Sequence, residues 1–148
     1  MFKHILLPTD GSELSDEAVQ KGIEFAKAVN AKVTSIFVTQ PYRVMLDDGF
    51  VVPSPAPTQA GYHEQAEQRA RKVLGVVERL AAQAGVQCHS VHESSAAPYD
   101  SIIKSAERAG CDLIMMASHG RRGLQALLLG SETNKVLTHT KIPVLVCR

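Results

Sequence analysis

The stretch Ile5-Leu6-Leu7, near the start of the chain, runs directly into Pro8-Thr9-Asp10-Gly11-Ser12, a turn of small and polar residues. The stretch is apolar at every position rather than at every second one, and Leu113-Ile114-Met115-Met116 repeats this pattern in the second half. A strand of this kind is buried on both faces, which is typical of a parallel sheet covered by helices on each side. These two stretches therefore predict an α/β fold.

Short apolar segments alternate with helical patterns along the chain. The expected strands are 3–7, 32–39, 86–93, 113–117 and 144–147. The expected helices are 14–29, 62–84, 98–110 and 131–140. This alternation predicts βαβ units in an open, doubly wound parallel sheet with helices on both faces.

The composition restricts the class of protein. The chain has 148 residues, of which 45% are hydrophobic and 21% charged, as expected for a single globular domain over 1–148. A formal net charge of +1 argues against a surface built to coat nucleic acid or membrane. Residues 1–100 carry 9 Lys+Arg and 12 Asp+Glu, whereas residues 101–148 carry 7 and 3. The positive excess therefore lies in the last third.

Cysteine usage and the first residues indicate a compartment. Cys88, Cys111 and Cys147 form no Cys-x-x-Cys pair, and each stands beside apolar residues in or near an expected strand, so we interpret them as structural thiols. The first apolar run is too short for a signal peptide, and no stretch approaches the ~18 apolar residues of a membrane span. We expect a cytoplasmic protein that contacts no membrane.

The segment 40–61 departs from the alternating pattern. It is rich in proline and glycine, which predicts a long flexible loop. It also contains apolar residues such as Met45, Leu46 and Phe50. Two interpretations remain open, a lid or partner surface on the one hand and a simple mobile insertion on the other.

The most informative loop leads from the fourth strand into the last helix, at 117–131. In an open parallel sheet, ligands bind at the carboxyl ends of the strands, where the strand order reverses. Gly130-Ser131 opens a helix whose free N–H groups and dipole favour an anion, and Arg121 and Arg122 add positive charge. The loop is therefore a candidate phosphate site. The alternative is an ordinary glycine loop with a serine cap and two solvated arginines.

Three other motifs do not fit. The Gly-Lys-Ser/Thr of a P-loop is missing, and no Gly-x-Gly-x-x-Gly follows the first strand, which weakens a dinucleotide interpretation. Gly120-Arg121-Arg122-Gly123 matches the Gly-x-x-Gly clamp of RNA-binding KH domains. That clamp lies between two helices, whereas this one follows an apolar strand, so we do not expect nucleic acid as a ligand.

Three features in combination resemble the A-type universal stress protein family. They are the opening 5–12, the spacing of nine residues between Gly120 and Gly130-Ser131, and the closing Ile142-Pro143-Val144-Leu145-Val146. The resemblance covers essentially the whole chain. It implies a Rossmann-like sheet of five parallel strands in the order 3-2-1-4-5 with four helices, and a homodimer formed through the last strand, 144–147. It also implies binding of an adenine nucleotide, ATP or AMP. From the chemistry of phosphates we expect any Mg²⁺ to accompany the nucleotide, held mainly by phosphate oxygens and water.

The nucleotide-binding branch of that family carries Gly-x-x-Gly, nine residues, then Gly-Ser or Gly-Thr. Here Ala117 stands where the first glycine is expected. Since alanine is the smallest replacement, we expect a slightly tighter pocket. The positions that the resemblance assigns to the nucleotide are Pro8, Thr9 and Asp10 near the adenosine, Val38 at the adenine, Met116 and Ala117 at its border, His119 and Gly120 along the phosphates, and Gly130, Ser131 and Thr133 around the terminal phosphates.

These features predict a regulatory stress-response protein that binds an adenine nucleotide. The alternative is a dimeric interaction protein of the same fold that has lost nucleotide binding, which Ala117 favours. No dedicated catalytic site is expected, because Asp10 and His119 belong to no Ser-His-Asp order and no helical His-x-x-x-His pair. No protein metal site is expected either. The resemblance leaves slow ATP hydrolysis or autophosphorylation open, with Ser131 as a candidate acceptor.

Overall fold

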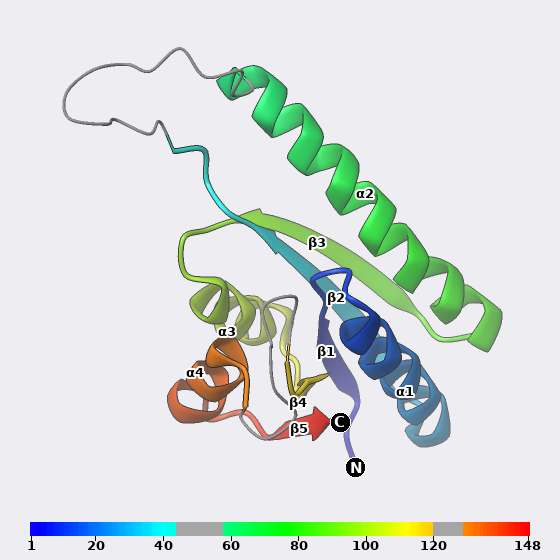
Figure 1. The fold of residues 1–148 in the computed structure, drawn as a ribbon. Coiled ribbons are helices and arrows are strands. Elements are labelled where there is room, and N and C mark those ends of the chain that lie inside the picture. The colour runs from blue at the N-terminus through cyan, green and yellow to red at the C-terminus, as the bar shows by residue number, and fades with distance from the viewer. Residues whose placement is uncertain (44–57, 120–128) are drawn as a thin grey trace.

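A computed structural model of the chain describes residues 1–43, 58–119 and 129–148. Within these residues, five strands alternate with four helices from the N-terminus to the C-terminus (Figure 1). The elements are β1 (His4–Pro8), α1 (Glu13–Val29), β2 (Lys32–Thr39), α2 (Gln59–Ala84), β3 (Cys88–Ser94), α3 (Pro98–Ala109), β4 (Leu113–Ala117), α4 (Ser131–His139) and β5 (Val144–Cys147).

The five strands form one parallel sheet in the order β3-β2-β1-β4-β5, which confirms the expected α/β fold and strand order. The chain builds outward from β1 to β2 and β3, then crosses back to place β4 and β5 on the other side of β1. The direction of winding therefore reverses between β1 and β4. Ligands of open α/β sheets bind beside the carboxyl ends of strands at such a point.

Helices cover both faces of the sheet, α1 and α2 on one and α3 and α4 on the other (Figure 1). Successive side chains of a strand point to opposite faces. Ile5 and Leu7 of β1 pack with α1 and α2, whereas Leu6 between them packs with α3 and α4. All three side chains are 0% exposed. This is why the central strands are apolar at every position.

The first strand begins and ends one residue later than expected. The N–H of Lys3 donates to the carboxylate of Asp112 at 2.8 Å instead of entering the sheet, and Pro8 stands in register with Ile36 of β2. The second oxygen of Asp112 accepts the N–H of His4 at 3.0 Å. Desolvation raises the pKa of Asp112, but these backbone hydrogen bonds outweigh it and leave the pKa below its usual range. Asp112 thus holds the amino end of β1 against the start of β4.

The boundaries around α2 also differ from the expectation. Its first residue is Gln59 rather than residue 62, because the hydroxyl of Thr58 accepts the N–H of Gly61 at 3.1 Å and caps an earlier turn. Residues 59–61 of the expected loop 40–61 are therefore helical, and 44–57 lie outside the described residues. Strand β3 starts two residues later than expected, since the N–H of Val86 closes the end of α2 on the carbonyl of Ala81.

The three cysteines are free thiols. Across 1–43, 58–119 and 129–148, no helix has the length and apolar character needed to cross a membrane.

Candidate functional site

The first loop of the candidate site follows β1. The N–H of Thr9 continues the parallel pairing by donating to the carbonyl of Ile36 at 2.9 Å. The buried hydroxyl of Thr9 lies 3.0 Å from that of Ser15 and accepts the N–H of Gly11 at 3.2 Å. The carboxylate of Asp10 accepts the N–H of Ser12 at 3.0 Å. Side chains therefore fix the backbone of this turn and hold Asp10 at the carboxyl end of the central strand.

A glycine is needed next to Asp10. Gly11 has φ +73°, a left-handed conformation that favours glycine, and a Cβ there would lie 2.8 Å from Cγ2 of Val73 on α2. The turn and α2 are thus in close contact. Burial and the nearby charge of Asp10 raise the pKa of Asp16 in the first turn of α1, so this end of the sheet already carries closely spaced acidic groups.

The second loop follows β4, and its two ends are tied together. Ser118 donates its N–H to the carbonyl of Cys147 at 2.8 Å, and its own carbonyl accepts the N–H of Gly130 at 2.8 Å. These bonds bring the start of α4 back to the end of β4. The predicted contact Gly120, together with Arg121 and Arg122, lies outside the described residues.

His119 carries an unsatisfied polar atom. Its Nδ1 lies 3.0 Å from the hydroxyl of Ser118, which orients the imidazole ring. Its Nε2 is buried and has no hydrogen-bond partner among the residues that the structure describes. A buried nitrogen in this state is costly, and a ligand able to pair with it would remove the cost.

The first turn of α4 is the third part of the site. Gly130 is the N-cap, so no side chain of the described chain caps this helix, and Ser131 at its first position is exposed. The unpaired N–H groups at such a helix start carry partial positive charge. Thr133 is buried, and its hydroxyl donates to the carbonyl of Ala117 at 3.0 Å. Thr133 therefore fastens the helix start to the end of β4.

The remaining predicted residues lie at the same end of the sheet. Pro8 ends β1, Val38 is the next-to-last residue of β2, and Met116 precedes Ala117 at the end of β4. Val38 is half-buried and Met116 is buried, and both pack with the cluster between the sheet and α3 and α4. Since β2, β1 and β4 are neighbours in the sheet, the structure brings together all the predicted positions that it describes.

Two residues of this region were not found from the sequence. Ser118 joins the ends of its loop and orients His119, and only its place beside His119 could have drawn attention to it. Glu132, next to Ser131, contacts the start of α3 through its carboxylate. No signal in the sequence links Glu132 with α3.

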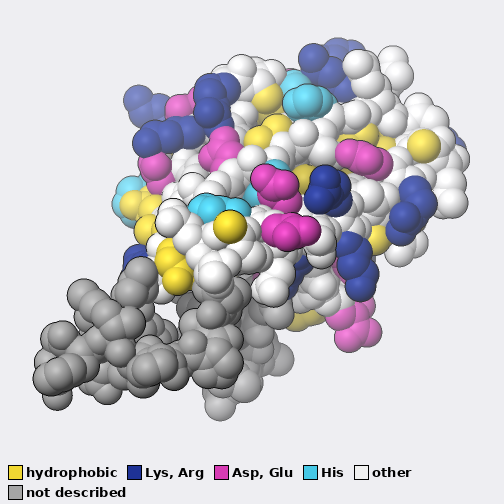
Figure 2. Space-filling model, turned by 90° about the horizontal axis from the view of Figure 1, so that it is seen from above, with side chains coloured by type: hydrophobic (Ala, Val, Ile, Leu, Met, Phe, Trp, Pro, Cys, Tyr) yellow, Lys and Arg dark blue, Asp and Glu magenta, His cyan; other side chains and the backbone are white. Residues whose placement is uncertain are grey.

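The molecular surface carries both signs of charge. Figure 2 shows Lys and Arg side chains interspersed with Asp and Glu over the face seen from above, with no wide region of a single sign among the coloured residues. A local anion site therefore fits this surface better than an extended polyanion does.

The sheet order and the two loops at its point of reversal define an open, doubly wound α/β protein, a class whose ligands bind beside the carboxyl ends of the central strands. The model of the universal stress protein family matches residues 1–148. The chain is 32% identical, over 149 residues, to the universal stress protein MJ0531 of Methanocaldococcus jannaschii, an alignment that covers 100% of this chain and 83% of that protein. The chain therefore belongs to the universal stress protein family.

Solved structures share its fold. The structure of protein MJ0577 matches with a TM-score of 0.81 and 27% identity over 99% of this chain and 95% of that one. A universal stress protein in complex with cAMP matches with a TM-score of 0.67 and 21% identity, over 99% of this chain and 97% of that one. A universal stress protein from Archaeoglobus fulgidus in complex with dAMP matches with a TM-score of 0.62 and 13% identity, over 100% of this chain and 98% of that one.

Proposed function

We propose that this protein binds an adenine nucleotide, ATP or AMP, at the carboxyl ends of β1, β2 and β4 and acts as a regulatory protein of the stress response. The buried Nε2 of His119, which has no hydrogen-bond partner among the described residues, is the observation that carries the proposal, because it lies in the loop that joins the end of β4 to the start of α4. Two universal stress proteins of the same fold have been solved in complex with cAMP and with dAMP, which supports an adenine nucleotide as the ligand.

In this proposal the adenosine lies between the ends of β1 and β2. Asp10, with Pro8 and Thr9 beside it, meets the adenosine, and Val38 contacts the adenine. The hydrogen bonds of the turn support this role, since they hold Asp10 in place before any ligand binds. A site fixed in advance loses less conformational entropy on binding.

The phosphates would lie along His119 and Gly120 and end at Gly130 and Ser131. The start of α4, which no side chain of the described residues caps, supplies backbone N–H groups and a favourable dipole for an anion. Any Mg²⁺ would be held mainly by phosphate oxygens and water. Among the residues described, no group of three or more His, Cys, Asp or Glu side chains could hold a metal ion.

Ala117 does not stand against this proposal. By strand alternation its methyl group lies on the same side of the sheet as Leu113 and Met115, which pack with α1 and α2. Helix α4 lies on the opposite side, where its Val136 packs in the same cluster as Met116. The methyl group of Ala117 therefore points away from the side of the sheet on which α4 packs. This weakens the alternative of a purely structural dimer without nucleotide.

The test is to recover the ligand and to measure its affinity. Freshly purified protein is denatured, and the supernatant is separated by ion exchange, where we expect ATP or AMP. Calorimetry of the emptied protein with added ATP and AMP should show binding of one nucleotide per chain. Recovery of no adenine nucleotide, together with no heat of binding, overturns the proposal.

We also propose a homodimer through β5. This strand is at the edge of the sheet and pairs only with β4 among the described elements, and Leu145 on it is 42% exposed. An apolar edge strand is a liability unless another strand or chain covers it. We expect a mass of about twice 16.0 kDa by light scattering, and a monomer for Leu145→Glu. The free thiols support the further proposal of a cytoplasmic location.

A further inference from the structure

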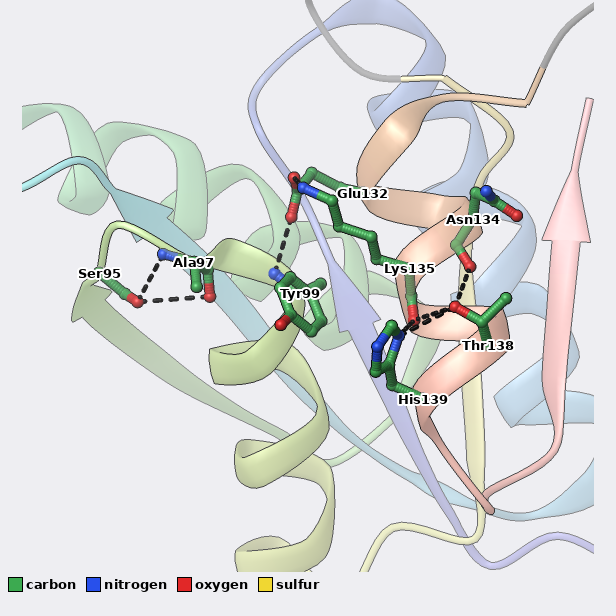
Figure 3. Close-up of polar contacts among 8 residues, drawn as sticks. All are labelled: Ser95, Ala97, Tyr99, Glu132, Asn134, Lys135, Thr138 and His139. Carbon is green, nitrogen blue, oxygen red and sulfur yellow. Dashed lines mark hydrogen bonds and ion pairs between the residues drawn. The ribbon is translucent and has the colours of Figure 1, made fainter.

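Helix α3 begins without a cap from its own part of the chain. Its N-cap residue is Ala97, which offers no side-chain hydrogen bond, and Pro98 at the first position has no N–H. The N–H of Tyr99 is paired instead with Oε2 of Glu132, at 2.8 Å (Figure 3). The carboxylate that caps α3 therefore comes from the first turn of α4.

The other oxygen of Glu132 is also engaged. Oε1 accepts a hydrogen bond from Nζ of Lys135 at 3.1 Å, one turn further along α4. The same ammonium lies 5.4 Å from the centre of the Tyr99 ring, and the ring of His139 packs on Tyr99 at 5.2 Å. The Glu132 side chain is 37% exposed. It is thus held between the two helices while it retains contact with solvent.

One carboxylate consequently acts on two helix starts. It is the second residue of α4, one position after Ser131, and α4 has no side-chain cap in the described chain. A negative charge in the first turn offsets part of the positive potential at the helix N-terminus, which would otherwise attract an incoming anion. An anion at the start of α4 would therefore meet attractive N–H groups and a repelling carboxylate together.

We propose that Glu132 determines how many phosphates the site favours. This inference rests on the proposed nucleotide site. The carboxylate disfavours the more highly charged triphosphate relative to the monophosphate, and its bond to Tyr99 keeps it in that place. Lys135 offsets part of the negative charge, which makes the discrimination moderate rather than absolute.

The test compares Glu132→Gln with wild type. Glutamine keeps an oxygen that can accept the N–H of Tyr99 but removes the charge. Calorimetry with ATP, AMP and adenosine gives three affinities for each protein. We expect the ratio of ATP to AMP affinity to rise about 2- to 5-fold in the variant, since a charge in the first turn contributes about 0.3–1 kcal/mol. Adenosine affinity should not change.

Two controls separate charge from structure. Glu107→Gln removes the same charge from an exposed position near the other end of α3 and should leave the ratio unchanged. Hydrogen exchange at the Tyr99 amide should stay slow in Glu132→Gln and become faster in Glu132→Ala. An equal loss of affinity for ATP, AMP and adenosine in Glu132→Gln would indicate a merely structural role and overturn the inference.

The outcomes for the two proposals are distinguishable. If wild type binds nucleotide but Glu132→Gln has the same ratio of ATP to AMP affinity, only the role of Glu132 is overturned. Failure of wild type to bind any adenine nucleotide overturns the proposed function and, with it, this inference. A rise in the ratio for Glu132→Gln but not for Glu107→Gln supports both.

Discussion

The buried hydroxyl of Thr133 donates a hydrogen bond of 3.0 Å to the backbone carbonyl of Ala117 and so joins the first turn of α4 to the last residue of β4. The two residues are 16 positions apart, and the loop between them contains the glycine spacing of the candidate site. This bond positions the start of α4 at the carboxyl end of the sheet.

Replacement of Thr133 by valine should therefore destabilise the protein. The change removes the donor and leaves the buried carbonyl of Ala117 unpaired, which costs about 1–3 kcal/mol. Urea unfolding measures this loss. Thr138→Val is the matched control, because Thr138 is an exposed residue of the same helix whose hydroxyl contacts carbonyls of the preceding turn and Nδ1 of the adjacent His139, all within α4. Its effect should stay within about 0.5 kcal/mol, and equal losses for the two variants would contradict this account.

Two glycines inside helices should respond in opposite directions to alanine. A Cβ on Gly75 would meet nothing within 4 Å, so Gly75→Ala should stabilise α2 by about 0.5–1 kcal/mol through a lower entropy cost of folding. A Cβ on Gly22 would lie 2.5 Å from Cδ2 of Leu7, which is 0% exposed. Overpacking of that kind should cost about 1–3 kcal/mol. Unfolding midpoints that shift in the same direction for both variants would show that the packing is not as described.

Gly130→Asp should abolish most of the proposed nucleotide binding without harming the fold. Gly130 has φ −57°, which any residue can adopt, and aspartate is a favourable N-cap. Its carboxylate would bond to the N–H groups of α4 and repel a phosphate, so ATP affinity in calorimetry should fall about tenfold. Gly130→Asn has the same shape without the charge and should bind ATP more tightly than the aspartate variant does. Wild-type affinity in Gly130→Asp would count against a phosphate site at this helix.

The stability of the protein should depend on His4 at mildly acidic pH. Burial, followed by the positive charge of Lys32, lowers the pKa of His4 below its ordinary value of 6.5. Its Nε2 lies 2.8 Å from the hydroxyl of Thr34. The folded state thus binds fewer protons than the unfolded state between the lowered pKa and about 6.5, so stability in that range rises with pH. The stability that neutral His4 contributes is fully present above about pH 6.5 and is lost as the pH falls through the lowered pKa.

Urea unfolding at about pH 7.5 and about pH 5.5 measures this dependence. His4→Gln keeps a polar partner for Thr34 but cannot titrate in this range. We expect wild type to lose more stability than the variant on acidification. His139→Gln, at an exposed position of α4, is the control and should follow wild type. The same loss in all three proteins would exclude His4 as the cause.

Most elements could be predicted because their causes are local. The apolar runs at 5–7 and 113–116 and the stripe of α2 identify strands and a helix without any knowledge of distant contacts. The boundaries were less accurate where a distant group decided them. The N–H of Lys3 pairs with Asp112, 109 positions away, although its carbonyl still accepts the N–H of Lys32, and no local pattern reports such a distant pair.

The candidate site likewise has a part that could be predicted and a part that could not. In a parallel sheet the ends of neighbouring strands lie together, so Asp10, Val38 and Ala117 could be placed at the carboxyl end of the sheet from the sequence and its family resemblance. The cap that Glu132 provides for α3 could not be predicted, and neither could the buried Nε2 of His119, which lacks a partner in the part of the chain that the structure describes. Both depend on how the end of β4, the start of α4 and α3 pack together.

By itself the sequence determined the class of fold, the five strands, the four helices and the edge of the sheet where a ligand would bind. Periodicity and turn chemistry act between neighbouring residues, and the family resemblance supplied the strand order. Only the tertiary structure decided which polar atoms meet, such as Thr133 with Ala117 and Glu132 with Tyr99. Those contacts join separate elements, so they form only when the helices pack on the sheet. Packing also buries the polar atoms, and a buried polar atom without a hydrogen-bond partner costs free energy.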